Sequence, residues 1–243
     1  MNIAIDIGNT HSKAAFYDGD VIIKTVILKG NIIKSFEKEV SDLKEKTAEL
    51  IICSVVDIEK DFLKYLDSNF RLTIFNSTTN IPIINLYHSP LTMGMDRLAS
   101  VIGVRAIYKS GNVLVIDAGT CITYDFLNAN NEYLGGGISP GIMMRFTALN
   151  NYTGKLPLIQ IIEENNLIGR DTMESIKSGV INGSIAEIAG IIDQYRWLYS
   201  DLKVIITGGD SQFFAINLKN GIFAAPHLVL QGLNEVLKFQ TKR

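Results

Sequence analysis

Two short acidic segments of the chain combine the residue types that bind phosphate. Residues 6–10 read Asp-Ile-Gly-Asn-Thr and residues 117–120 read Asp-Ala-Gly-Thr, each between two apolar runs, which is the pattern of a β-hairpin. Glycine and asparagine tolerate positive φ, so such a turn can direct several backbone N–H groups at one anion. The aspartate can hold a divalent cation through water, as Mg²⁺ prefers, and Lys13 can place a charge beside a phosphate. Both segments therefore predict phosphate binding, although either one alone also fits an ordinary hairpin turn.

The repetition of this hairpin favours phosphoryl transfer. The sequence NIAIDIGNTHSKAAFYD near the start is echoed by NVLVIDAGTCITYDFL from residue 112. Two hairpins at equivalent places in two similar lobes can clamp the phosphates of one nucleotide from both sides. Phosphoryl transfer needs mainly positioning and charge neutralisation, which this arrangement supplies. A third segment, Thr-Gly-Gly-Asp-Ser at 207–211, fits either a loop on the adenosine side or a strand-to-helix turn with an N-cap.

The segment Gly94-Met95-Asp96-Arg97 opens a predicted helix and allows two interpretations. An aspartate in the first turn complements the helix dipole, so its role can be structural. Alternatively, Asp96 is a general base that accepts the proton of an attacking hydroxyl, while Arg97 pairs with a carboxylate or with phosphate charge. Taken by themselves, these residues favour the structural interpretation.

The apolar periodicity predicts the elements that carry these segments. In the first half, strands are expected at residues 1–7, 12–17, 21–28, 50–56 and 72–75, and helices at 32–46, 58–70 and 96–108. The first three strands are joined by short turns and are expected to be antiparallel. The helix over 32–46 rests on Ile33, Phe36, Val40 and Leu43, which recur at three or four residues.

The same pattern restarts at Asn112. Strands are expected at 113–117, at 121–126, from 132 and at 203–207, and helices after Pro140, over 171–199, after Asp210 and over 226–239. This internal repeat predicts an α/β protein of two similar halves. The two hairpins together with the segment at 207–211 resemble the arrangement in the actin, Hsp70 and sugar-kinase superfamily, which implies a duplicated ribonuclease-H-like fold. We expect two lobes, 1–110 and 111–243, with the active site in the cleft between them.

Composition and charge exclude several classes of protein. The chain has 243 residues, of which 47% are hydrophobic and 20% charged, the balance of a well-cored globular protein. The net charge of −2 gives no electrostatic reason to expect nucleic acid or an anionic membrane as a partner. No segment approaches a membrane span and the start reads as a strand, so a cytoplasmic location is expected. Cys53 and Cys121 lie in apolar runs without metal-ligand spacing and are expected to be buried thiols.

The chain resembles the type III pantothenate kinase family nearly from end to end. The segments that carry this resemblance are DIGNTHSK (6–13), LYHSPLTMGMDR (86–97), VIDAGTCITYD (115–125), YLGGGISPG (133–141), IGRDTMESIKSG (168–179) and ITGGDS (206–211). Their combination at these separations is specific, whereas any one of them alone is weak. The resemblance implies ATP-dependent phosphorylation of pantothenate to 4'-phosphopantothenate, the first step of coenzyme A biosynthesis.

The resemblance also implies roles for particular residues. The expected ATP-binding residues are Asp6, Ile7, Gly8, Asn9, Thr10, His11, Ser12, Lys13 and Thr120. The expected pantothenate-binding residues are Tyr87, Gly94, Met95, Asp96, Arg97 and Thr172. Asp96 is expected to be the catalytic proton acceptor, Asp117 to bind a monovalent cation (K⁺ or NH₄⁺), and Asp6 to hold the Mg²⁺ that comes with ATP. The family's substrate site lies near a homodimer interface, so Thr172 can reach it from the other subunit.

Two departures from the family pattern bear on the site. Cys121 stands where alanine is usual, and a slightly larger buried side chain there is expected to have little effect. Asp171 stands where asparagine is usual, and it either adds negative charge beside an acidic substrate or caps the following helix.

Some interpretations stay open on the sequence alone. The helical region from 171 carries an apolar stripe, which can be buried either at a dimer face or by packing within the lobe. Its positions are Ile176, Val180, Ile185, Ile188 and Ile192. Alternative functions are another small-molecule kinase of the same superfamily, or a non-catalytic actin-like regulator that binds nucleotide. The intact acidic and Thr residues argue against loss of chemistry, and the segment GMDR argues against a sugar as acceptor.

Overall fold

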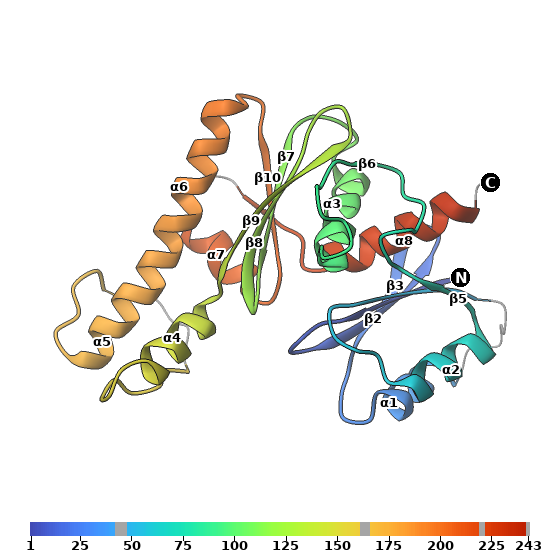
Figure 1. Ribbon diagram of the computed structural model, residues 1–243, viewed down its shortest axis with the longest axis horizontal. Coiled ribbons are helices and arrows are strands. Elements are labelled where there is room, and N and C mark those ends of the chain that lie inside the picture. The colour runs from blue at the N-terminus through green and yellow to red at the C-terminus, as the bar shows by residue number, and fades with distance from the viewer. Residues whose placement is uncertain (42–47, 161–165, 219–221, 242–243) are drawn as a thin grey trace. The chain divides into compact units, whose positions relative to one another are not determined.

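The computed structural model describes residues 1–41, 48–160, 166–218 and 222–241, and its contacts divide the chain into two compact units. The first unit comprises Met1–Ser110, Asn131–Tyr133 and His227–Arg243, and the second comprises Gly111–Asn130 and Leu134–Pro226. This division differs from a single boundary after residue 110, because the C-terminal helix packs with the first unit (Figure 1). Each unit is described below by itself.

The first unit is built on a mixed sheet with the order β3-β2-β1-β4-β5. Its strands are β1 (Asn2–Ile7), β2 (Ser12–Asp18), β3 (Val21–Leu28), β4 (Glu49–Ser54) and β5 (Arg71–Ile74). As predicted, β1, β2 and β3 form an antiparallel meander, while β4 runs parallel to both β1 and β5. Alternate residues of the central strands are buried on opposite faces, so helices are needed on both.

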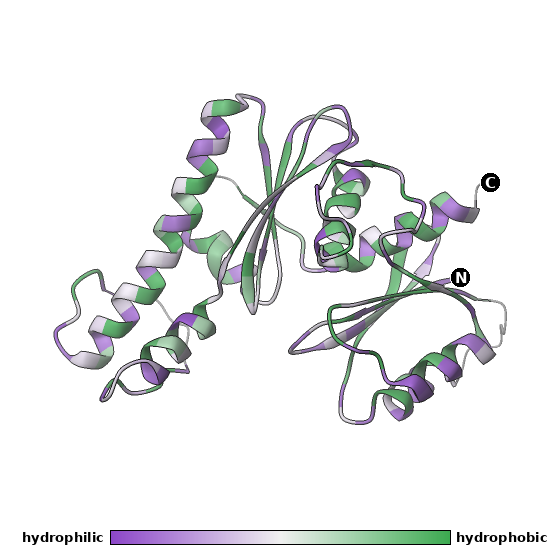
Figure 2. Ribbon diagram, in the orientation of Figure 1, coloured by the Kyte–Doolittle hydropathy of each residue, from purple (hydrophilic) through white to green (hydrophobic). Residues whose placement is uncertain are grey.

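Helices cover the two faces of this sheet (Figure 1). On one face, α1 (Ile32–Val40) and α2 (Lys60–Asn69) insert Phe36 and Phe62 against Ile3 and Ile5. The other face carries α3 (Met95–Ile107) and α8 (Leu228–Thr241), which pack closely on each other. Figure 2 shows hydrophobic residues concentrated in the strands and alternating with hydrophilic ones along α2.

The second unit repeats this topology. The sheet has the order β11-β10-β7-β8-β9-β6 and ends in a short edge strand, β6 (Ile84–Asn85). Its other strands are β7 (Val113–Ala118), β8 (Cys121–Leu127), β9 (Glu132–Pro140), β10 (Lys203–Thr207) and β11 (Phe223–Ala224). The first hairpin, β7 with β8, is antiparallel, and β10 pairs in parallel with β7, as β4 does with β1. The fold is therefore α/β and duplicated, as the internal repeat predicted.

The helices of the second unit gather around one apolar core. They are α4 (Ile142–Asn151), α5 (Thr172–Lys177), a π-helical turn at Ser178–Asn182, α6 (Gly183–Leu198) and α7 (Ser211–Asn217). Ile176, Val180, Ile188 and Ile192 are buried in this core together with residues of β7 and β10. The apolar stripe of the predicted helix over 171–199 is thus occupied by packing within the unit, which settles the question that the sequence left open.

Most predicted elements are present with small shifts at their ends. The helix expected over 32–46 ends at Val40, and its position Leu43 falls in the stretch 42–47, outside the described residues. Two strands of two residues each, β6 (Ile84–Asn85) and β11, were not predicted. Across the described ranges, no helix is long and apolar enough to cross a membrane.

Candidate active site

The predicted phosphate hairpin lies between β1 and β2. Asp6 is opposite Lys13 and Ile7 is opposite Ser12, and the turn is closed by the amide of Gly8, which donates to the carbonyl oxygen of His11 over 3.1 Å. The remaining turn residues, Asn9 and Thr10, are exposed together with His11. The structure thus brings the eight predicted residues from Asp6 to Lys13 together in one tight turn whose tip is accessible to a ligand.

Asp6 is electrostatically unusual. Its Oδ1 atom is buried and makes no hydrogen bond within the described residues. The pKa of this carboxyl is raised from 3.8 to about 7. Burial is the largest cause, the nearby charge of Asp96 adds to it, and Lys13 acts in the opposite direction. A cation at this carboxylate would relieve both unfavourable effects, so the residues fit the predicted role of Asp6 toward a metal ion.

Asp96 lies at the N-terminus of α3. The helix begins after Gly94, and Asp96 Oδ1 accepts a hydrogen bond of 2.8 Å from the amide of Arg97. A Cβ atom at position 94 would lie 2.5 Å from Asp96 Oδ1, so a larger residue there would displace the carboxylate from its observed position. The positive end of the helix dipole stabilises this carboxylate as an anion. The helix-end role proposed from the sequence and a role in chemistry are therefore compatible.

Arg97 and Tyr87 come together beside this helix start. Arg97 is 6% exposed, and the centre of its guanidinium lies 5.7 Å from the centroid of the Tyr87 ring. Tyr87 also stacks on Tyr133, with ring centroids 6.0 Å apart. Tyr87 follows the short strand β6, which pairs with the start of β9 at Tyr133. An arginine held over an aromatic ring keeps its planar fork oriented for a carboxylate.

The second acidic hairpin joins β7 to β8. Asp117, near the end of β7, is opposite Thr207 on β10, and Thr120 is exposed in the turn. Gly208 has a φ of +93°, and a Cβ there would lie 2.4 Å from Asp117 Oδ1. The amide of Asp210 donates to the carbonyl oxygen of Ala118 over 2.9 Å. The glycine-rich segment after β10 is therefore docked directly on the acidic hairpin, which the sequence alone did not show.

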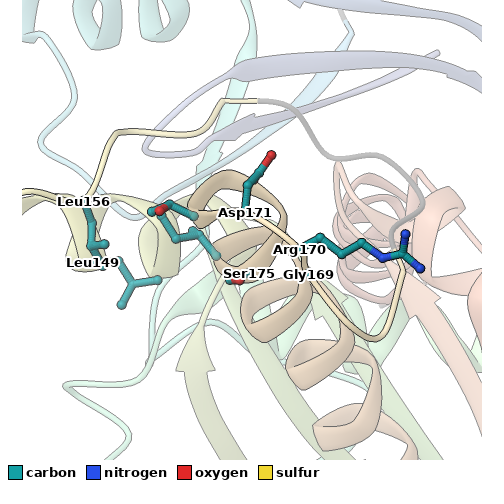
Figure 3. A pocket seen from close by; sticks show the side chains of 8 residues that line it. Leu149, Leu156, Gly169, Arg170, Asp171 and Ser175 are labelled. Carbon is teal, nitrogen blue, oxygen red and sulfur yellow. The ribbon is translucent and has the colours of Figure 1, made fainter.

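Thr172 lies in a pocket of the second unit (Figure 3). The pocket has a volume of about 620 Å³ and is lined by Leu149, Leu156, Gly169, Arg170, Asp171, Thr172, Ser175 and Ile176. Asp171 Oδ1 accepts from the amide of Glu174 over 2.8 Å, and Glu174 Oε2 accepts from the amide of Arg170 over 2.8 Å. The first of these bonds shows that Asp171 caps α5, the second of the two roles expected for it. Figure 3 shows the Arg170 side chain extending away from Leu149 and Leu156.

Cys53 is a buried thiol, as expected, and it lies beside the first hairpin, which the sequence did not predict. Cys53 on β4 is opposite Asp6 in the parallel pairing, and it is fully buried. Burial raises the pKa of its thiol, and the charges of Asp6 and Asp96 raise it further. The thiol is therefore kept protonated and unreactive. The pairing of β1 with β4 brings these two residues together, although they are 47 positions apart in the chain.

Comparison with known proteins agrees with these features. The family model described as "Type III pantothenate kinase" matches residues 2–194. The type III pantothenate kinase of Flavobacterium johnsoniae is 38% identical over 99% of this chain and 98% of its own length. Among solved structures, a Campylobacter jejuni protein provisionally assigned to the Baf family of transcriptional activators aligns with a TM-score of 0.65 at 21% identity, covering 99% of this chain and 100% of that one. A ROK family protein from Streptococcus pneumoniae aligns with a TM-score of 0.53 at 11% identity, covering 100% and 99%.

Proposed function

The chain belongs to the type III pantothenate kinase family, and we propose that its acceptor site is the group of residues around Asp96 in the first unit. The protein is a kinase that phosphorylates pantothenate with ATP, in the pathway of coenzyme A biosynthesis. The observation that carries the site is the position of Asp96: a carboxylate at the start of a helix, electrostatically coupled to Asp6 of the phosphate hairpin and adjacent to the buried Arg97.

In this site Asp96 is the proposed general base. It accepts the proton of the pantothenate hydroxyl as the oxygen forms a bond to the γ-phosphorus of ATP, and the bond to ADP breaks. Arg97 is the proposed partner of the pantothenate carboxylate, with Tyr87 holding its guanidinium in place. Gly94 and Met95 complete the proposed site by shaping the start of α3. Gly94 does so by leaving space for the carboxylate of Asp96.

The nucleotide is proposed to bind at the two acidic hairpins. In the first unit, the exposed turn at Asn9 and Thr10 supplies backbone donors and Lys13 supplies a positive charge. ATP carries Mg²⁺, and the buried Oδ1 of Asp6 has the free acceptor capacity that such a cation needs. In the second unit, Thr120 is the proposed nucleotide contact, because it is exposed at the tip of the equivalent turn.

Asp117 is the proposed ligand of a monovalent cation, K⁺ or NH₄⁺. Its carboxylate is half-buried at the end of β7 and lies against the segment at Gly208. Carboxylate and carbonyl oxygens are the hard donors that an alkali cation takes, and the residues present fit this ion. A cation here would neutralise negative charge close to the proposed nucleotide turn.

Thr172 is proposed to contribute to the pantothenate site across a homodimer interface. It belongs to the second unit, and none of the other predicted substrate residues lines its pocket. The described surface of this unit exposes large apolar side chains, which supports an interface: Tyr152, Leu167, Ile168 and Trp197 are all more than 75% exposed. A cytoplasmic location is proposed as well, because ATP is the phosphoryl donor.

One assay tests the reaction and the cation together. Purified protein with ATP, Mg²⁺ and K⁺ is expected to release ADP only when pantothenate is added, and to release it more slowly when Na⁺ replaces K⁺. A panel of sugars and short carboxylic acids serves as the control and is expected to give no ADP. ADP release that is independent of pantothenate would contradict the function, and equal rates with Na⁺ and K⁺ would contradict the role of Asp117.

A further inference from the structure

A network of polar side chains connects four elements of the second unit, β8, β9, α4 and α6. The guanidinium of Arg145 on α4 donates through Nη2 to Glu187 Oε2 on α6 over 2.6 Å and to Ser139 Oγ over 2.7 Å. The other oxygen of Glu187 accepts from the Tyr124 hydroxyl on β8 over 2.9 Å. No local sequence pattern indicates this network, because its members are separated by up to 63 positions along the chain.

The network is charged and largely shielded from water. The side chains of Arg145 and Glu187 are 22% and 29% exposed. Burial alone would raise the pKa of Glu187, but hydrogen bonds from Arg145, Ser139 and Tyr124 outweigh it and hold the pKa below its ordinary value. The pair is therefore ionised at neutral pH. A half-buried ion pair is not in itself a strong source of stability, because desolvation offsets much of the attraction. The hydrogen-bond geometry of the pair therefore says more about its role than its contribution to stability does.

The network fixes the end of β9 by its backbone. Arg145 Nε donates to the carbonyl oxygen of Pro140 over 2.8 Å, so the same guanidinium holds Ser139 and Pro140. The next residue, Gly141, donates its amide to the carbonyl oxygen of Thr120 over 3.1 Å. A Cβ at position 141 would lie 2.2 Å from the carbonyl oxygen of Gly119, so the two backbones are in direct contact. Arg145 is therefore connected to the Gly119–Thr120 turn through the backbone of Pro140 and Gly141.

We propose that Arg145 and Glu187 are positioning residues for the nucleotide. They hold the end of β9, which in turn sets the position of the Gly119–Thr120 turn against which the phosphates of ATP bind. This inference rests on the proposed nucleotide role of that turn. Lysine cannot replace Arg145, because a single ammonium cannot reach Pro140, Ser139 and Glu187 in the planar fork that the guanidinium provides.

The test is a comparison of Arg145→Lys and Glu187→Gln with the unchanged protein. Arg145→Lys keeps the positive charge but removes the planar fork, and Glu187→Gln keeps the size of the side chain but removes its negative charge. We expect the KM for ATP and the dissociation constant of Mg·ATP, measured by calorimetry, to rise by between about tenfold and a hundredfold, the scale expected for a displaced binding group. The KM for pantothenate is expected to change less than about twofold, since a change confined to nucleotide binding is not shared by the other substrate.

Two controls separate positioning from loss of structure. Arg196→Lys alters an exposed ion pair with Asp193 on the same α6 and is expected to leave both constants unchanged. Gly141→Ala disturbs the contact with the turn directly, so its effect on Mg·ATP affinity should not add to that of Arg145→Lys. A lower melting temperature with unaltered Mg·ATP affinity, or strictly additive effects, would overturn the positioning role.

The calorimetric measurement also keeps this inference distinct from the proposed function. If Thr120→Ala leaves Mg·ATP affinity unchanged and Arg145→Lys also does so, the turn does not bind nucleotide and both ideas fail. If the protein binds Mg·ATP but releases no ADP with pantothenate, the acceptor assignment fails. In that case a selective loss of Mg·ATP affinity in Arg145→Lys still supports the positioning role.

Discussion

A carboxylate that is buried beside another carboxylate keeps its proton to a higher pH than usual, and Asp6 is in this situation. Its pKa is raised from 3.8 in the unfolded chain to about 7 in the folded, ligand-free protein. Between these values the folded protein holds a proton that the unfolded chain has released. The free energy of unfolding is therefore expected to fall as pH rises from about 4 to about 7, and this contribution is constant outside that window.

Thermal unfolding of the ligand-free protein measured against pH tests this expectation. The difference in melting temperature between the unchanged protein and Asp6→Asn should vary across the window and become flat above about pH 7. Taking this difference removes contributions from groups that both proteins share, such as His227, whose pKa burial lowers. A difference that is constant from pH 4 to pH 8 would show that Asp6 titrates normally in the folded state.

Loss of the Asp96 carboxylate is expected to slow the chemical step and to leave ATP binding nearly unchanged. Asp96→Asn removes the proposed base but keeps the shape of the side chain, so kcat should fall at least about a hundredfold, the usual contribution of general base catalysis. The KM for ATP should change little, because Asp96 is not among the proposed nucleotide contacts. Circular dichroism should show an intact fold. Turnover similar to that of the unchanged protein would rule out Asp96 as the base.

Residues of the candidate site differed in how far the sequence revealed them. Asp6, Asp96 and Asp117 could be proposed from the sequence because each lies near the end of a strand or at the start of a helix, two residues from a glycine, and this is a local pattern. The position of Cys53 beside Asp6 and the network of Arg145 with Glu187 were not predicted, since these contacts join distant segments. Ordinary spacing rules carry no information about such contacts.

At the scale of elements, the contact of α3 with α8 determines where the proposed base lies. The two helices cross at glycines: a Cβ on Gly232 would lie 1.7 Å from the carbonyl oxygen of Ala99, and one on Gly103 would lie 2.3 Å from that of Leu228. Both contacts are with backbone atoms, which cannot move without shifting a helix. Because Asp96 is on the first turn of α3, this crossing and the acceptor site are mechanically connected.

Gly232→Ala is therefore expected to lower stability by about 1–3 kcal/mol through overpacking and to reduce kcat as well. Gly190→Ala is the matched control, since position 190 is also inside a helix but has no atom within 4 Å of a built Cβ. That substitution should be neutral or stabilise the protein by up to about 1 kcal/mol, the difference in helix propensity. Chemical denaturation measures both changes. Equal effects of the two substitutions would mean that the helices can separate without strain.

The elements themselves were predicted well where periodicity is strong. The central strands and the helices α2, α3 and α8 lie within two residues of the expected bounds, because each has a regular apolar pattern. The strands β6 and β11 have two residues each, too few to show any period, and they exist only through pairing with β9 and β10. The π-helical turn at Ser178–Asn182 was also invisible, since a helix with one wide turn keeps nearly the same apolar pattern.

At the scale of the whole molecule, the duplication could be predicted from the sequence, but the packing of the C-terminal helix in the first unit could not. Both sheets have a three-stranded side and a parallel side in the same order, as the repeated hairpin sequence predicted. The C-terminal helix α8 nevertheless packs in the first unit. There Asn234 accepts a hydrogen bond from Asn2 and donates one to the carbonyl oxygen of Gly19. Local sequence patterns carry no information on whether a C-terminal helix packs against the N-terminal segment of the same chain.

The proposed homodimer predicts that two inactive variants recover activity when mixed, which is expected only if each acceptor site is built from both subunits. If the acceptor site takes Asp96 from one subunit and Thr172 from the other, then Asp96→Asn and Thr172→Arg each inactivate both sites of their own dimers. A mixed dimer has one site with both substitutions and one site with neither. Unfolding and refolding the two inactive proteins together should therefore restore activity, to about a quarter of the unchanged protein if subunits pair at random. Sedimentation should show dimers throughout. A mixture that stays inactive although mixed dimers have formed would place Thr172 in the site of its own chain, or in none.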